Sequence, residues 1–152
     1  MPEAWRIVKE KHAATAFTGE GAAKVGGRWN SRGVAVVYTS GTKALAALEN
    51  LVHLNPPVLF KYVGIRIEFE ESLVTRVALT DLPADWRVEP PPASTKQFGD
   101  AWVRTGGSAI LALPSVIISG EPNFLLNPAH ADFNKIVRGT PEAFAFDPRL
   151  LT

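Results

Sequence analysis

An arginine that follows two glycines is the first group in this sequence that could do chemistry. Arg28 lies in the stretch GGRWNS, residues 26–31. A guanidinium is a planar fork that suits a phosphate or a carboxylate, and a glycine such as Gly27 lets a ligand approach the backbone closely. Trp29 offers a flat surface for stacking. The alternative is an arginine on a solvated loop beside a tryptophan packed in the core, because exposed polar loops are common.

Glu49 is the second candidate, and its position in a predicted helix makes it informative. Helical spacing in the stretch KALAALENLVHL, residues 43–54, places Glu49 near Leu45 and Val52, on or beside the apolar face. A carboxylate in that position must be paired, exposed in a cleft, or shifted in its pKa. Spacing alone also allows a glutamate at the edge of the apolar face that reaches water or pairs with His53.

Two hydroxyl groups and the histidines complete the candidates. Tyr38 closes the apolar stretch VAVVY, where its ring can pack while its hydroxyl emerges at the sheet edge; the alternative is a core tyrosine with a satisfied hydroxyl. Ser115 follows Pro114 in an apolar run, so its hydroxyl needs a partner, and no GxSxG nucleophile motif is present. Neither GxGxxG nor GxxxxGK[ST] occurs. We predict no metal site, because no HxxxH or HExxH spacing relates His12, His53 and His130.

The elements that must position these groups alternate between strands and helices. We predict one α+β domain over residues 1–152, with a mixed sheet in which strands are the majority. The predicted helix at residues 43–54 has Thr42 as N-cap and ends before Pro56 and Pro57. The other predictions are strands at residues 4–8, 33–40 (buried on both faces), 58–69, 73–79 and 108–118 (broken by Pro114), a polar glycine-containing loop through residues 19–27, a proline-rich loop at 81–94, a helix at 95–106, and a strand, a turn and a closing strand within 133–147.

Composition excludes several classes of protein. Of the 152 residues, 46% are hydrophobic and 20% charged, which is ordinary for a globular domain. A net charge of +1 gives no basic patch for direct nucleic-acid binding. The sequence contains no run of about eighteen apolar residues, so we predict no membrane span, and we do not expect its first residues to be a secretion signal. The absence of cysteine suits a reducing compartment, so we expect a cytoplasmic protein.

Taken in order, these stretches resemble the RES domain family over almost the whole chain. The family is named for an arginine, a glutamate and a serine, which match Arg28, Glu49 and Ser115. The matching stretches are AWRIV, GAAKVGGRWNSRGVAVVYTS, KALAALENLVHL, LPADWR, FGDAWVRTGGSAILALPSVI, EPNFLLNPAHADF and FAFDPRLL.

The resemblance implies a fold, an activity and a partner. RES proteins are toxins of bacterial toxin–antitoxin pairs, with a fold similar to ADP-ribosyltransferases: a twisted mixed sheet with a cleft for NAD. The implied activity is depletion of NAD, as a substrate rather than a cofactor, by hydrolysis or by phosphorolysis with inorganic phosphate. The alternatives are transfer of ADP-ribose to a protein and a non-enzymatic partner-binding module. The implied partner is an Xre-like helix-turn-helix antitoxin that covers the active site, and a homodimer within that complex is also allowed.

The resemblance also implies roles for individual residues. Arg28 would hold the NAD diphosphate or ribose side, Tyr38 would stack on nicotinamide or position the ribose, and Glu49 would face the reacting ribose. Ser115 would line the pocket. The remaining implied contacts are Arg6 to a phosphate, Gly27 through its close backbone, and Trp29 and Asn30 either in the cleft wall or only as supports for the arginine. The sequence leaves Trp86 and Trp102 open as lid or core residues.

Overall fold

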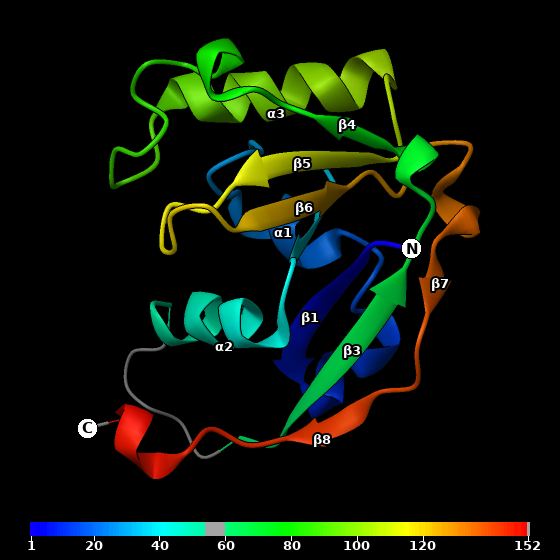
Figure 1. Ribbon diagram of the computed structural model, residues 1–152, viewed down its shortest axis with the longest axis vertical. Coiled ribbons are helices and arrows are strands. Elements are labelled where there is room, and N and C mark those ends of the chain that lie inside the picture. Colours follow the sequence, from blue (N-terminus) through cyan, green and yellow to red (C-terminus); the bar gives the residue numbers. More distant parts are fainter. Residues whose placement is uncertain (54–59, 152) are drawn as a thin grey trace.

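The β-branched and apolar stretches form strands of one mixed sheet in a computed structural model that describes residues 1–53 and 60–151 (Figure 1). Among the described residues the strand order is β4-β5-β6-β2-β1-β3-β7, and β8 also pairs with β3. β4 and β5 are parallel, and the other pairs are antiparallel. The strands are β1 (Glu3–Lys9), β2 (Val37–Ser40), β3 (Tyr62–Glu68), β4 (Val74–Arg76), β5 (Ile110–Pro114), β6 (Pro122–Leu126), β7 (Val137–Arg138) and β8 (Glu142–Phe144).

The helices begin and end at residues whose chemistry explains the boundary. α2 starts after Thr42, whose hydroxyl accepts a hydrogen bond from the Leu45 backbone N–H at 3.0 Å, so the predicted N-cap is confirmed. α3 ends at Gly106, a left-handed glycine with φ 62°. The helices are α1 (Glu20–Val25), α2 (Lys43–Leu51) and α3 (Ala93–Thr105), with short 3-10 helices at Glu10–Thr15, Glu71–Leu73, Leu79–Asp81, Phe133–Lys135 and Pro148–Leu151.

Alternation along the strands divides the core between the two faces of the sheet. One face carries Val37 and Leu126 and is covered by irregular segments that contribute Phe17 and Phe133. The opposite face carries two apolar clusters, one beneath each of the longer helices. Trp102 of α3 packs with Leu111, Leu113 and Leu125, whereas Ala46 of α2 packs with Ile7 and Tyr62.

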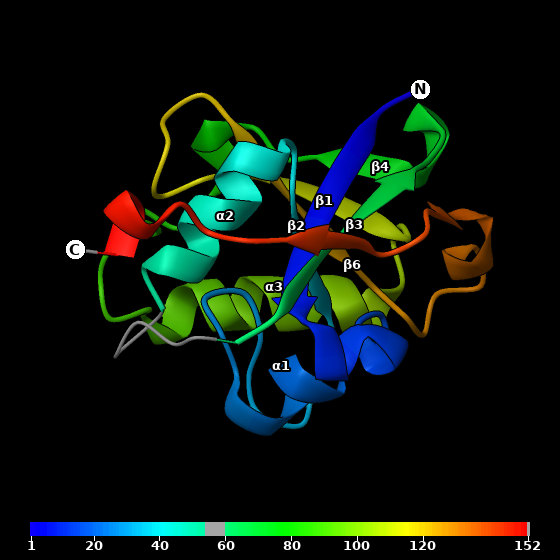
Figure 2. The same cartoon turned by 90° about the horizontal axis from the view of Figure 1, so that it is seen from below.

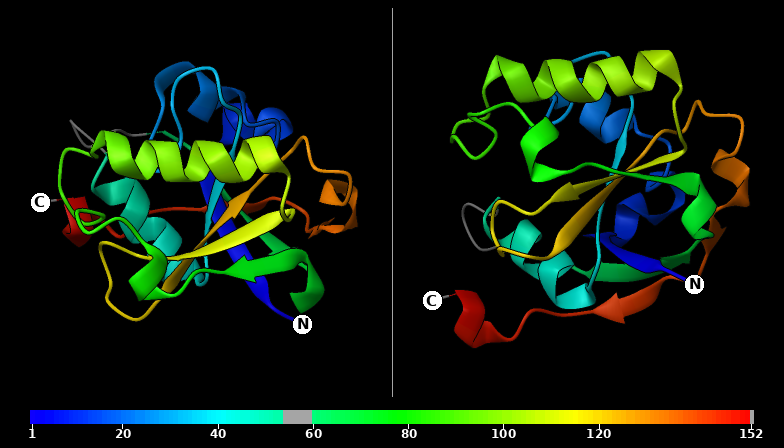
Figure 3. Two further views of the ribbon diagram at one scale, coloured as in Figure 1. Left: turned by 90° about the horizontal axis from the view of Figure 1, so that it is seen from above. Right: turned by 45° about the horizontal axis from the view of Figure 1, so that its top comes forward.

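Because α2 and α3 pack on the same face, the strand residues between them are the natural floor of a site. β2 joins the two halves of that face: Tyr38 is opposite Leu125 of β6, and Ser40 is opposite both Trp5 of β1 and Asn123 of β6. The sheet is strongly twisted, so β1 and β3 cross the direction of β5 and β6 (Figures 1 and 2). Figure 3 shows α3 lying along the β4–β5–β6 half and α2 at some distance from it.

The expected α+β fold with a twisted mixed sheet is confirmed. The predicted strands at residues 4–8 and 73–79, the helix at 95–106 and the closing strands within 133–147 correspond to β1, β4, α3, β7 and β8. α2 ends at Leu51, and the predicted helix end at residue 54, the prolines at 56 and 57 and the start of the predicted strand at 58–59 lie outside the described residues. No helix of the described residues is both long and apolar enough to cross a membrane.

Three predicted element boundaries were wrong. The glycine-containing loop holds helix α1, which is bracketed by the left-handed glycines Gly19 and Gly26 with φ 79° and 73°. The strand expected at 33–40 is reduced to β2, because Val34 belongs to a turn in which its N–H donates to the Ser31 carbonyl at 3.1 Å. The strand expected at 108–118 does break at Pro114, as predicted, but the residues after the break form a loop and not a second part of the strand. β6 was not predicted at all.

Candidate active site

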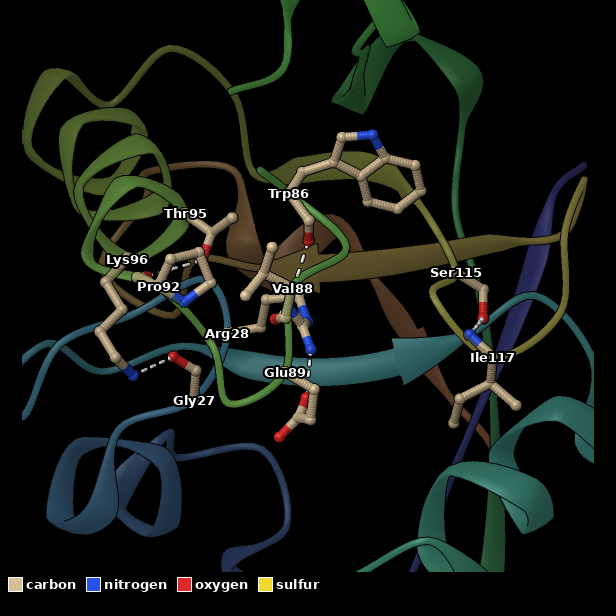
Figure 4. Close-up of polar contacts among 10 residues, drawn as sticks. All are labelled: Gly27, Arg28, Trp86, Val88, Glu89, Pro92, Thr95, Lys96, Ser115 and Ile117. Carbon is tan, nitrogen blue, oxygen red and sulfur yellow. Dashed lines mark hydrogen bonds and ion pairs between the residues drawn. The ribbon is translucent and has the colours of Figure 1, made fainter. Parts of the chain in front are cut away.

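Arg28 is held by the proline-rich segment that the sequence places far away along the chain. Its Nη1 donates to the Trp86 carbonyl at 3.1 Å and the Val88 carbonyl at 2.6 Å, and its Nη2 pairs with the Glu89 carboxylate (Figure 4). Only 13% of the Arg28 side chain is exposed. The alternative of an arginine on a solvated loop is therefore excluded by its contacts.

Helix α3 fixes the loop that carries Arg28. Lys96 Nζ donates to the Gly27 carbonyl at 2.6 Å, and Asp100 accepts hydrogen bonds from the Ser31 backbone N–H at 2.9 Å and the Ser31 hydroxyl at 2.5 Å. Gly99 lies against the Trp29 carbonyl so closely that an added Cβ would be 1.7 Å from its oxygen. Three hydrogen bonds and one close backbone contact therefore hold the loop against α3.

Trp29 and Asn30 are buried beneath this loop. Trp29 is 4% exposed and packs edge-to-face on Phe98, and Asn30 is 0% exposed. The Asn30 Nδ2 donates to the carbonyls of Ala22 at 2.9 Å and Val34 at 3.0 Å, with a longer contact to the Ser31 carbonyl at 3.3 Å. Neither side chain is accessible to a substrate, so the prediction that they line the cleft is not supported and their alternative role as supports for Arg28 is favoured.

The hydroxyl of Tyr38 makes hydrogen bonds within the loop that carries Arg28. Its hydroxyl donates to Asn30 Oδ1 at 2.5 Å and accepts from the Trp29 backbone N–H at 3.0 Å. Burial raises the pKa of Tyr38, with a smaller opposing effect from the Trp29 hydrogen bond. Gly27 is required by the same contact, since a Cβ there would be 2.6 Å from the Tyr38 hydroxyl oxygen. The half-buried ring remains the part of Tyr38 that could face a ligand.

Glu49 lies in a half-buried position on α2, beside the apolar face as the sequence predicts. Burial raises the pKa of its carboxyl, opposed by hydrogen bonds from Asn123 and Ser115 and by the charges of His53 and Arg28. The Ser115 hydroxyl approaches Glu49 Oε1 at 3.5 Å. No ion pair joins Glu49 to His53 in the described part of the chain, so the carboxylate is neither a paired nor a fully solvated group.

Ser115 lies at the turn that ends β5, with its hydroxyl buried. Its Oγ accepts hydrogen bonds from the backbone N–H groups of Ile117 and Ile118, both at 3.1 Å (Figure 4). Its backbone N–H donates to the Glu121 carbonyl at 2.9 Å. The Ser115 hydroxyl, for which the sequence predicted a partner, therefore accepts two hydrogen bonds within the β5–β6 connection and can donate one to Glu49.

Sequence reasoning missed two residues of this region, Asn123 and Glu89. Asn123 is the second residue of β6 and lies opposite Ser40 of β2; its Nδ2 donates to the Ser40 hydroxyl at 3.1 Å and contacts the Thr39 carbonyl at 3.4 Å, and a hydrogen bond from its side chain lowers the pKa of Glu49. Glu89 lies in the segment read only as a surface loop. Asn123 lies in the stretch EPNF, which belongs to the family resemblance. Because β6 was not predicted, the sequence alone could not place this polar side chain beside Glu49.

Arg6 is not brought to Glu49. On β1 it alternates with Trp5 and Ile7, so it lies on the opposite face of the sheet, next to Ile65 of β3. Its Nε donates to the Ala16 carbonyl at 2.7 Å and its Nη1 to the Tyr38 carbonyl at 2.9 Å, and burial lowers its pKa to about 10. Its predicted contact with a phosphate stays a prediction.

The structure gathers four of the predicted residues on one face of the sheet: Arg28, Tyr38, Glu49 and Ser115. In Figure 4 Arg28 lies over the first half of β2 and Ser115 lies near its tip, between α3 and α2. Trp102 is a core residue whose Nε1 donates to the Ser108 hydroxyl at 3.0 Å. Trp86 packs partly against the same core and presents its carbonyl to Arg28. Surface cavities of about 340 and 400 Å³ lie elsewhere, beside Phe60 and between β4 and α3.

Such an arrangement joins an anion-binding group to a partly desolvated carboxylate. The guanidinium can hold a phosphate or a carboxylate, and the carboxylate can stabilise a positive charge that develops beside it. The positive charge of Arg28 also lowers the pKa of Glu49, by less than the hydrogen bonds to that carboxyl do.

Comparisons with known proteins show the family and the fold of this chain. The RES domain family model matches residues 3–147. "Toxin Res" of Yersinia enterocolitica is 39% identical over 148 residues, covering 96% of this chain and 97% of that protein. "Prs ADP-ribosylating toxin" of Sphingobium sp. is 38% identical over 153 residues, covering 97% and 95%. A chain of the M. tuberculosis MbcT–MbcA toxin–antitoxin complex has the same fold, with a TM-score of 0.80 at 15% identity over 99% of this chain and 86% of that one.

Proposed function

Because this chain belongs to the RES domain family, we propose that it is the toxin of a bacterial toxin–antitoxin pair and that it acts by cleaving the nicotinamide–ribose bond of NAD. The observation that carries the proposal is Glu49, a half-buried carboxylate held beside Ser115 and within the field of Arg28. Relatives of similar length named as toxins support the first part, and one relative named as ADP-ribosylating supports chemistry at this bond.

The chemistry needs one well-placed carboxylate. When the C–N bond to nicotinamide breaks, the bonding electron pair leaves with neutral nicotinamide and positive charge develops at the ribose carbon, as in glycoside hydrolysis. The Glu49 carboxylate stabilises that charge and accepts a hydrogen bond from a ribose hydroxyl. A second acid is unnecessary, because the leaving group departs from a pyridinium.

The other groups bind and orient. Arg28 holds the diphosphate with charge-assisted hydrogen bonds, and the half-buried ring of Tyr38 packs against the nicotinamide–ribose end. Ser115 and Asn123 hold the carboxylate of Glu49 by hydrogen bonds. Holding the remote half of the substrate supplies binding energy that is used at the reacting carbon. The acceptor is water in hydrolysis or inorganic phosphate in phosphorolysis, and the acceptor's proton passes to solvent.

The decisive experiment is product analysis after incubation of the purified protein with NAD. We expect nicotinamide release, with ADP-ribose as the second product in hydrolysis or ADP-ribose-1″-phosphate when phosphate accelerates the reaction. Glu49→Gln should lose turnover by a factor of about 10² or more while remaining folded, as expected for removal of a preorganised electrostatic group. Glu70→Gln, at an exposed glutamate outside the site, is the matched control. Full turnover in Glu49→Gln would remove Glu49 from the mechanism.

Transfer of ADP-ribose to a protein is a second candidate, favoured by the relative named "Prs ADP-ribosylating toxin". Labelled NAD incubated with cell lysate separates the two, because transfer leaves label on a protein band and hydrolysis releases it as free ADP-ribose. If the protein neither binds nor consumes NAD at millimolar concentration, a non-enzymatic binding module is the better description.

We also propose an antitoxin that covers the site. The supporting observation is that the structural neighbour belongs to a toxin–antitoxin complex. An Xre-like helix-turn-helix protein encoded beside this chain's gene is the expected partner, and its addition should abolish NAD cleavage. A homodimer within that complex would appear as a doubled toxin mass in light scattering.

A further inference from the structure

The guanidinium of Arg28 is occupied from within the chain by two different kinds of acceptor. Its Nη1 donates to the carbonyls of Trp86 and Val88, whereas its Nη2 donates to the carboxylate of Glu89 (Figure 4). A carbonyl is a fixed neutral dipole, but a carboxylate is an anion with the same planar, bidentate-capable chemistry as the oxygens of a phosphate. Glu89 thus fills the position at Arg28 that an anionic ligand would need.

The two kinds of acceptor are anchored very differently. The Trp86 side chain packs partly against the core beneath α3, and the Trp86 backbone N–H donates to the Pro83 carbonyl at 3.1 Å. Asp85 next to it accepts a hydrogen bond from the Ser94 hydroxyl at 2.5 Å. The Glu89 side chain, in contrast, is 73% exposed, and among the described residues its carboxylate is paired with Arg28. The Val88 backbone N–H donates to the Asp85 carbonyl at 3.1 Å, so both carbonyls belong to a hydrogen-bonded segment, whereas the Glu89 carboxylate is mostly in solvent.

Exposure also limits the strength of the Arg28–Glu89 pair. An ion pair whose carboxylate is mostly solvated is weak, because water and salt screen it and the side chain loses rotamer freedom in forming it. A diphosphate brings more negative charge and more acceptor oxygens to the same guanidinium. Exchange of one anion for the other would leave Arg28 oriented, since its contacts with the Trp86 and Val88 carbonyls do not depend on Glu89.

We propose that the Glu89 carboxylate is an internal competitor that occupies the anion site of Arg28 in the free protein and is displaced by the diphosphate of the substrate. The proposal rests on the proposed function for the identity of the substrate, but the exchange itself requires only an anionic ligand at Arg28. It makes Glu89 a competitor that lowers affinity for every anion and keeps weakly bound phosphate compounds out of the site.

The test compares the natural protein with Glu89→Gln, which keeps the size of the side chain and removes its charge. Because an exposed pair contributes little, we expect KM for NAD to fall about two- to five-fold with kcat unchanged. Titration calorimetry with ADP, which carries the diphosphate but no bond to cleave, should show a similar drop in Kd. Glu71→Gln is the matched control, since Glu71 is also an exposed partner of an arginine, Arg76, outside the site.

The two assays separate this proposal from the proposed function. Tighter ADP binding by Glu89→Gln without any cleavage of NAD would support displacement and refute the reaction. Cleavage of NAD with unchanged KM and unchanged ADP affinity would support the reaction and overturn displacement. Weaker binding of both ligands by Glu89→Gln would also overturn it, because Glu89 would then contact the ligand rather than compete with it.

Discussion

Asn30 offers the sharpest test of how the arginine loop is held, because its predicted contact with substrate and its observed burial lead to different results. Replacing Asn30 with alanine removes the hydrogen bonds that its side chain makes with three part-buried groups: the Ala22 and Val34 carbonyls and the Tyr38 hydroxyl. A hydrogen bond of this kind contributes about 1 kcal/mol, so the loss of all three gives a total of about 3 kcal/mol.

That loss is large against the stability of a single domain. Folding free energies are about 5–15 kcal/mol, and for a chain of this length 1 kcal/mol shifts Tm by about 2–4 °C. We therefore expect Asn30→Ala to lower Tm by about 6–12 °C, measured by circular dichroism during heating and by urea unfolding. Asn30→Asp should cost more than Asn30→Ala, although it is isosteric, because it places a carboxylate against the Ala22 and Val34 carbonyls.

The control is Asn134→Ala, at an exposed asparagine of the 3-10 helix Phe133–Lys135. It should change Tm by less than about 2 °C, since surface substitutions usually stay within 0.5 kcal/mol. If Asn30→Ala unfolds at the temperature of the control but has a raised KM for NAD, Asn30 is a ligand contact and the assignment of a supporting role is wrong.

Three further results are expected. Gly99→Ala should destabilise the fold by about 1–3 kcal/mol and raise KM for NAD, because its Cβ would collide with the Trp29 carbonyl; unfolding and kinetic assays check this. Gly107→Ala, just beyond α3, is the control, since an added Cβ there meets no atom closer than 4.0 Å, and it should keep its stability and its KM. Since burial raises the pKa of Glu49, the acidic limb of the pH profile of kcat/KM should lie above the usual range for a glutamate. In Asn123→Ala this limb should move to higher pH, because the variant loses a hydrogen bond that favours the ionised carboxylate. A limb at the same pH in both proteins would exclude Asn123 as a positioning residue. The same raised pKa means that the folded state favours the protonated carboxyl of Glu49. The natural protein should therefore lose stability as pH rises through that pKa, whereas Glu49→Gln should not. If the urea midpoints of the two proteins change with pH in the same way across about pH 4–8, the assignment is contradicted.

The sequence was sufficient wherever the signal was local. Helical spacing placed Glu49 at the edge of the apolar face, and Thr42 marked the start of α2. Both inferences depend on residues within one or two turns of each other. The assignment of Arg28 and Ser115 as site residues depends instead on the family resemblance, which uses the order of stretches along almost the whole chain, and it stays a prediction.

Other features could not be predicted because they depend on contacts between distant residues. β6 is five residues long and begins at a proline, so it carries little periodic signal, and Asn123 was missed with it. The partner of Arg28 is a glutamate 61 residues further along, in a segment that reads as an ordinary surface loop. Burial of Asn30 likewise follows from the way α1 and the turn at Val34 close over it.

The wide separation of the site residues along the chain has a consequence for the cell that makes this protein. A ribosome that has synthesised residues 1–110 has already made Arg28, Tyr38 and Glu49, but neither Ser115 nor Asn123. β6, which pairs with β2 and completes the face beneath Glu49, is also still missing at that stage. Because the candidate site depends on these late pairings, a chain that stops before β6 lacks the strand that completes the face beneath Glu49, and the site can form only when nearly the whole domain has folded.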